Sequence, residues 1–137
     1  MPEAIAALAD ALRRVGDRWS LLVVAALLDG PRRFGDLERA VPGVTSSVLA
    51  SRLRQLESDG LVVATPYSTR PARVDYRLTA TGEELAGAVR LLAAWAAAAP
   101  GGSDVPTHRT CGTPLEVRWW CPACAVPAED TSGELWA

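Results

Sequence analysis

The chain has 137 residues, of which 49% are apolar and 22% are charged, and its net charge is −2. This length suits one domain with an appendage, and the apolar share is sufficient to bury a core. No apolar stretch approaches the roughly 18 residues of a membrane span, and the N-terminal residues lack the pattern of a signal peptide. The sequence therefore predicts a cytoplasmic protein without a membrane segment.

The charge is distributed unevenly along the chain. Residues 31–79 contain eight Arg against five acidic residues, whereas residues 1–30 contain three Arg against four and residues 80–137 contain three Arg against seven. A basic middle segment between acidic flanks indicates a surface for DNA. Every basic residue other than His is Arg, whose planar fork suits phosphate and guanine contacts. A GC-rich genome would produce the same Arg bias.

Hydrophobic spacing predicts three helices and a short extended piece in the first part of the chain. Helical periodicity covers residues 3–14, and an almost wholly apolar run at 19–28 predicts a buried second helix. An extended piece at 32–34 precedes a brief helix over 35–41. Pairs of Gly and Pro follow the second and third helices and are expected to end them.

The next helix presents a small polar face. Thr45 is expected to cap a helix that runs to about Ser58, with an apolar stripe of leucines on one side. The opposite side has short side chains and ends in one long cation; it comprises Ser47, Ala50, Ser51 and Arg54, with Ser46 at its edge. Two helices joined by a short turn, the second with such a face, suggest a helix-turn-helix that binds DNA. An ordinary solvated helix face is the alternative interpretation.

Two predicted strands follow, over residues 61–64 and 74–78, and the loop between them contains Arg70 and Arg73. A hairpin after a recognition helix forms a wing, whose arginines reach phosphates or an adjacent minor groove. Thr81 is expected to cap a last helix that extends to about residue 99. This helix is too apolar for a solvated element, so it predicts a homodimer that reads a pseudo-palindrome.

All three cysteines and the only histidine lie within seventeen residues, as His108, Cys111, Cys121 and Cys124. Two closely spaced donor pairs predict a tetrahedral Zn²⁺ site similar to a zinc ribbon over residues 107–128. Ala125 stands where such a turn usually has Gly. A disulfide switch between Cys121 and Cys124, a protein-docking adaptor and unliganded thiols remain alternatives. Residues 100–106 are expected to form a linker, and residues 129–137 an acidic tail.

Four separated blocks, at residues 15–22, 28–37, 49–62 and 71–79, followed by Gly82 and Trp95, resemble the HxlR family of winged-helix regulators. The resemblance implies a MarR-related homodimer over residues 1–99, which binds double-stranded DNA and dimerises through its terminal helices. It implies DNA contacts from the 45–58 helix and the wing. The candidate DNA-binding residues are Arg32, Arg33, Thr45, Ser46, Ser47, Ala50, Ser51, Arg54, Arg70 and Arg73.

The sequence departs from this family in two respects. Some members sense oxidants through a cysteine near the N-terminal helix, but no cysteine precedes Cys111. The segment from about residue 104 is an addition to the family core. The overall prediction is a mainly α fold with a small β-hairpin (α+β) in a protein that is not an enzyme. It is expected to repress transcription by occupying a promoter, with a small-molecule or redox effector left open.

Overall fold

The computed structural model describes residues 2–98, 107–116 and 118–128. The predicted linker at 100–106 and acidic tail at 129–137 lie outside these residues. The chain divides into two compact units, one formed by residues 9–89 and the other by residues 1–8 with 90–137. Among the described residues, no helix is long and apolar enough to cross a membrane.

Four helices begin the chain, and they confirm the predicted order. They are α1 (Pro2–Val15), α2 (Arg18–Leu27), α3 (Phe34–Ala40) and α4 (Ser46–Ser58). The Asp17 carboxylate caps α2 by accepting hydrogen bonds from the backbone N–H groups of Trp19 and Ser20, at 2.9 and 3.1 Å. The Thr45 hydroxyl caps α4 by accepting from the N–H of Val48 at 3.4 Å. Both helices therefore begin where a side-chain acceptor satisfies their first free N–H groups.

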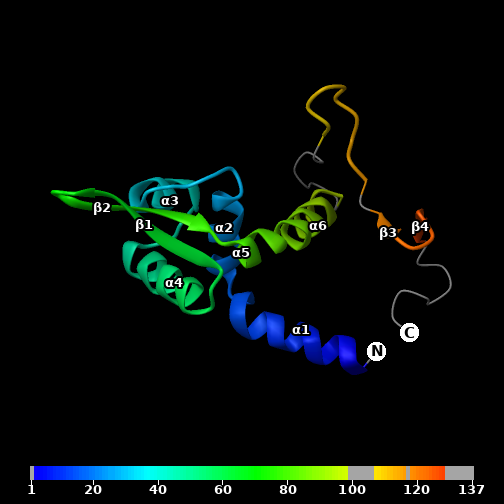
Figure 1. Cartoon of the computed structure of the whole chain (residues 1–137), viewed down its shortest axis with the longest axis horizontal. Coiled ribbons are helices and arrows are strands. Elements are labelled where there is room, and N and C mark those ends of the chain that lie inside the picture. Colours follow the sequence, from blue (N-terminus) through cyan, green and yellow to red (C-terminus); the bar gives the residue numbers. More distant parts are fainter. Residues whose placement is uncertain (1, 99–106, 117, 129–137) are drawn as a thin grey trace. The chain divides into compact units, whose positions relative to one another are not determined.

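The hairpin is longer than the sequence predicted. Strands β1 (Val62–Thr69) and β2 (Ala72–Leu78) pair antiparallel, and the pairing extends to Thr69 opposite Ala72. The predicted nine-residue loop is therefore mostly strand, since Pro66 is tolerated in a two-stranded sheet where its missing N–H need not be paired. The tip of this hairpin extends past α3 and α4 (Figure 1).

One hydrophobic core fixes α4 against its neighbours. The leucines of the predicted stripe, Leu49, Leu53 and Leu56, are at most 1% exposed. They pack in a cluster of side chains from α2, α3 and the hairpin that includes Val23, Val24, Leu27, Leu37, Val41, Leu61, Val62 and Leu78. Burial of each such side chain contributes roughly 1.5–3 kcal/mol. The core therefore orients the opposite face of α4 away from the protein.

The last helical region differs from the prediction in two ways. Its cap is Thr79 rather than Thr81, because the Thr79 hydroxyl accepts from the N–H of Gly82 at 3.1 Å and donates to the Gly60 carbonyl at 2.6 Å. The single predicted helix is divided into α5 (Ala80–Glu84) and α6 (Ala86–Ala97) at Leu85. Two residues of low helix propensity, Gly82 and Gly87, flank this interruption.

Candidate nucleic-acid interface and candidate metal centre

The predicted recognition face of α4 is open to solvent at its ends. Ser47 and Arg54 are exposed, and Ala50 and Ser51 between them are half-buried. Within the described residues, the Arg54 guanidinium has no hydrogen-bond or ion-pair partner. This face combines short side chains, which permit a close approach, with one unpaired five-donor cation.

A side-chain hydrogen bond joins the N-terminal edge of α4 to α3. The Ser46 hydroxyl donates a hydrogen bond to the Glu38 carboxylate of α3, and the hydroxyls of Thr45 and Ser47 lie 3.3 Å apart. Ser46 is therefore engaged by the partner helix of the helix-turn-helix. Ser47 remains the more available hydroxyl for a nucleic acid.

The two wing arginines stand at the tip of the hairpin. Arg70 lies in the two-residue turn and Arg73 in the first part of β2, and both are exposed. Among the described residues neither forms an ion pair. Their charges are therefore available to phosphates, in the position that the wing prediction requires.

Arg32 and Arg33 have protein partners. The backbone of Arg32 exchanges two hydrogen bonds with Tyr76 of β2, at 2.9 and 2.8 Å. Its guanidinium donates to the Ala26 carbonyl at 2.5 Å and lies 3.7 Å from the Asp29 carboxylate. The Arg33 side chain contacts the hairpin instead.

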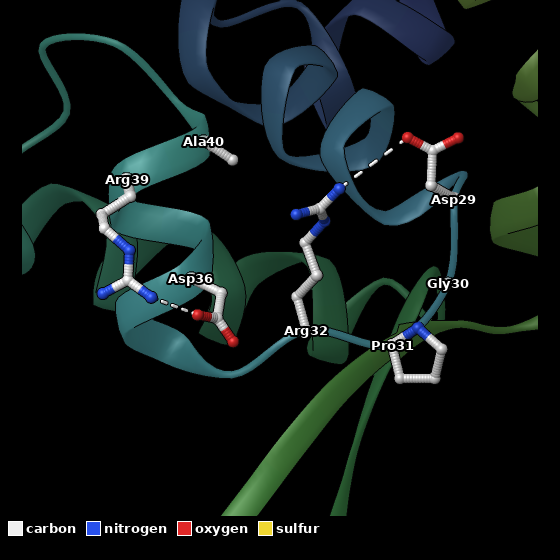
Figure 2. Close-up of a pocket in the computed structure, with 7 residues that line it drawn as sticks. All are labelled: Asp29, Gly30, Pro31, Arg32, Asp36, Arg39 and Ala40. Carbon is white, nitrogen blue, oxygen red and sulfur yellow. Dashed lines mark hydrogen bonds and ion pairs between the residues drawn. The ribbon is translucent and has the colours of Figure 1, made fainter.

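A polar hollow of about 400 Å³ lies beside Arg32 (Figure 2). Its lining comes from the α2–α3 turn and α3, and consists of Asp29, Gly30, Pro31, Arg32, Asp36, Arg39 and Ala40. Figure 2 shows each arginine paired with a carboxylate, Arg32 with Asp29 and Arg39 with Asp36. The charges in this hollow are thus already balanced.

Two polar contacts between α4 and the first part of the chain were not predicted. Arg52 of α4 lies 3.4 Å from the Asp17 carboxylate, and Arg14 of α1 donates to the Asp59 carbonyl at the end of α4 at 2.8 Å. Partial burial raises the pKa of Asp17, but hydrogen bonds from Ser20 and Trp19 and the Arg52 charge together hold it below its usual 3.8. The capping position of Asp17 is readable from the sequence, whereas a partner 35 residues away is not.

The tail contains two turns of the same backbone form. In the first, the N–H of Gly112 donates to the His108 carbonyl at 2.8 Å; in the second, the N–H of Ala125 donates to the Cys121 carbonyl at 2.9 Å. Gly112 has φ 71° and Ala125 has φ 55°, so both turns close with a left-handed residue. Ala125 therefore adopts the left-handed conformation for which such a turn usually has Gly. The second turn joins β3 (Trp119–Cys121) and β4 (Val126–Ala128).

Each turn presents a pair of metal donors. The His108 Nδ1 and Cys111 Sγ atoms lie 3.3 Å apart, and the N–H of Cys124 points at the Cys121 sulfur at 3.5 Å. Within the part of the chain that the structure describes, no three potential donors gather at one point. The donor types and turn geometry fit zinc within each pair, but the two pairs are not brought together.

The surroundings of two thiols favour the thiolate. Hydrogen bonds with the side chain and the backbone of Thr113, and with the His108 ring, lower the pKa of Cys111 to about 7. The N–H of Cys124 is the main group that lowers the pKa of Cys121. Thiolate is the form that both metal coordination and thiol oxidation require.

A helix-turn-helix followed by a β-hairpin, with a small polar helix face and a basic hairpin tip, defines the winged helix-turn-helix transcription regulators. Residues 14–101 match the family model of the HxlR-like helix-turn-helix. The chain belongs to this family, whose members bind DNA and regulate transcription rather than catalyse a reaction.

Similar proteins agree with this assignment. Rv3095 of Mycobacterium tuberculosis, described as an HTH-type transcriptional regulator, is 40% identical over 118 residues, which cover 83% of this chain and 74% of that protein. A transcriptional regulator of the MarR family from Enterococcus faecalis superposes with a TM-score of 0.60 at 38% identity, over 66% of this chain and 82% of that one. The redox regulator HypR in its oxidized form superposes with a TM-score of 0.64 at 30% identity, over 68% of this chain and 96% of that one.

The similarity to the mycobacterial protein extends into the tail. It spans 83% of 137 residues, about 114 residues, whereas the family model ends at residue 101. A continuous span of that length cannot end before about residue 114, so it includes the positions of His108 and Cys111. The first turn of the tail therefore lies within the region shared with this relative.

Proposed function

We propose that this transcription regulator binds a specific double-stranded DNA site as a homodimer and represses transcription by occupying a promoter. The observation that supports sequence-specific binding is the α4 face, where Arg54 is exposed and unpaired among the described residues. A free guanidinium on a recognition helix forms the bidentate contact with guanine that is the commonest specific contact in the major groove. The wing arginines add affinity that is independent of sequence.

Exposed apolar side chains on two helices support the homodimer. On α1, Ile5, Leu8 and Leu12 are 54–65% exposed at helical spacing. On α6, Leu92 is 51% and Trp95 77% exposed, and no described residue of this helix is fully buried. A second copy of the chain would cover these side chains, and two-fold symmetry would match a pseudo-palindromic operator.

For the tail we propose a structural Zn²⁺ ion held by His108, Cys111, Cys121 and Cys124. The matching turns and the donor pairs support it, and the ion would have to draw the two pairs together. Metal binding of this kind supplies the folding free energy of a segment with little core. The exposure of Leu115, Trp120 and Val126, each at least 50%, agrees with such a segment.

A thiol switch is the second candidate for the tail. The observation that favours it is the structural similarity to HypR, which is described as a redox regulator. The three cysteines are free, so a Cys121–Cys124 disulfide could form on oxidation. A docking site for another protein is the remaining alternative for the same segment.

The DNA-binding proposal is tested by selecting duplexes from a random-sequence library with the full-length protein. The selected duplex and a scrambled duplex of the same composition are then compared by fluorescence anisotropy over a range of salt concentrations. We expect a pseudo-palindromic consensus, tighter binding of the selected duplex, and affinity that falls steeply with salt. Equal affinity for the two duplexes at every salt concentration would contradict sequence-specific recognition.

A further inference from the structure

Arg33 occupies a helix-capping position without acting as a cap. It is the N-cap residue of α3, and its side chain makes no capping hydrogen bond. Ser, Thr, Asp and Asn are preferred at this position because their oxygens accept from free N–H groups, and a guanidinium cannot accept. The Arg33 side chain therefore serves something other than α3.

That side chain contacts both strands of the hairpin. Its guanidinium carbon lies 4.7 Å from the centre of the Tyr67 ring of β1, within the range of a cation–π contact. Its Nε atom lies 3.8 Å from the Asp75 carboxylate of β2. One cation thus bridges the two strands from a helix outside the hairpin.

A bulge in β1 supplies the aromatic partner. Pro66 pairs with Val74 and Ser68 pairs with Arg73, so Tyr67 between them has no residue opposite it. A β-bulge redirects the side chain of its extra residue. The bulged residue, Tyr67, is therefore the one whose ring contacts Arg33.

The neighbouring residue attaches the same segment to the hairpin by its backbone. Arg32 exchanges hydrogen bonds with Tyr76, next to Asp75 in β2. The base of the hairpin is also held by Val62 and Leu78 in the core and by the N–H of Ala64, which donates to the Glu57 carboxylate of α4 at 3.2 Å. All of these contacts lie near the base, and a contact further toward the tip fixes the direction of the ribbon. The Tyr67 contact provides that contact nearer the tip.

We infer that Arg33 is a positioning residue that latches the wing to α3 through Tyr67 and Asp75, and so sets where the tip arginines meet DNA. This inference rests on the proposed DNA-binding function. A direct phosphate contact by Arg33 is the competing role, and the tests separate the two.

The first test needs no DNA. The chain has two tyrosines, Tyr67 and Tyr76, so protein labelled with 3-fluorotyrosine gives two ¹⁹F resonances, which the Tyr67→Phe variant assigns. We expect Arg33→Ala to shift the Tyr67 resonance toward that of an unstacked ring. The control Arg39→Ala removes a neighbouring arginine of α3 whose ion pair is with Asp36 of the same helix, and it should leave Tyr67 unchanged. An unchanged Tyr67 resonance in Arg33→Ala would overturn the latch.

The second test is a double-mutant cycle on the selected duplex. Arg33→Ala and Tyr67→Leu should each weaken binding about three- to fivefold, the usual strength of an exposed cation–π contact, and each should lower the melting temperature by only a few degrees, so that the protein remains folded. The double variant should bind no more weakly than the weaker single variant, because both changes release one latch. If the double variant loses affinity by the product of the two single losses, or if Tyr67→Leu binds like the wild type, Arg33 would instead contact a phosphate directly.

The two tests also separate this inference from the proposed function. If the wild type selects no DNA sequence, but Arg33→Ala still shifts the Tyr67 resonance, the contact of Arg33 with the wing is supported and sequence-specific DNA binding is contradicted. If the wild type selects an operator, but the variants give neither expected result, the proposed function is supported and the positioning role of Arg33 is contradicted.

Discussion

Arg54 is the residue to which we assign base recognition in the proposed function. It is exposed at the end of a face otherwise built from small residues, with no partner among the described residues. We expect Arg54→Ala to reduce discrimination between selected and scrambled duplexes by about 1–3 kcal/mol, since a bidentate guanine contact contributes that much. Anisotropy titrations of both duplexes measure this difference, with the exposed Arg13 of α1 replaced by Ala as the control. Equal losses on the two duplexes would assign Arg54 to the backbone.

Asp17 combines a capping role with an ion pair to the recognition helix. We expect Asp17→Ala to lower the free energy of unfolding by about 1–2 kcal/mol at neutral pH, and Asp17→Asn to lower it less because the amide oxygen still accepts. The folded pKa of Asp17 lies below the ordinary 3.8, so its contribution is present above that pH and is lost as the pH falls below it. The free energies of unfolding of the wild type and of Asp17→Ala, measured by urea denaturation, should therefore converge in acid. A constant gap at all pH values would contradict the role of the carboxylate charge.

At the scale of the elements, Gly82 allows α5 to lie against the start of the hairpin. A Cβ atom at this position would lie 2.0 Å from the Leu61 carbonyl oxygen, whereas at Gly87 it would meet nothing within 4 Å. We expect Gly82→Ala to lower stability by at least about 1–3 kcal/mol through overpacking. Gly87→Ala should raise stability by up to about 1 kcal/mol through helix propensity. Thermal denaturation measures both, and the same sign for the two variants would contradict this packing.

Ala125 and Gly112 occupy equivalent places in the two turns of the tail. A left-handed conformation costs a residue with a Cβ roughly 1 kcal/mol, and Gly avoids that cost. We expect Ala125→Gly to tighten zinc binding about fivefold and Gly112→Ala to weaken it by a similar factor, as measured by competition with a chromogenic chelator. Zinc affinities that do not respond to either change would show that these turns do not hold the metal.

The helices were predictable because their spacing, caps and stops are local, as with Thr45 and the leucine stripe of α4. The strand ends, the Thr79 cap and the break at Leu85 depend on contacts with other elements, such as the Thr79 hydroxyl on the Gly60 carbonyl. Among the candidate site residues, the exposure of Arg54 followed from helical periodicity. The partners of Arg33 did not, since a bulge at Tyr67 and a carboxylate 42 residues away have no periodic pattern.

At the scale of the whole molecule, the proposed dimerisation and the proposed metal binding rest on different residues, and a native mass spectrum of protein purified without chelator tests both. We expect two protomers with two zinc ions. Leu8→Glu should place a charge on the exposed apolar face of α1 and yield zinc-bound monomers, whereas the double variant Cys121→Ala/Cys124→Ala should yield metal-free dimers. Glu3→Gln, which changes an exposed polar residue of the same helix, serves as the control for Leu8. A metal-free wild-type dimer lighter by two hydrogen atoms per protomer would replace the zinc site with a disulfide. A monomeric wild type would contradict the proposed two-fold reading of the operator, because one copy presents only one recognition helix.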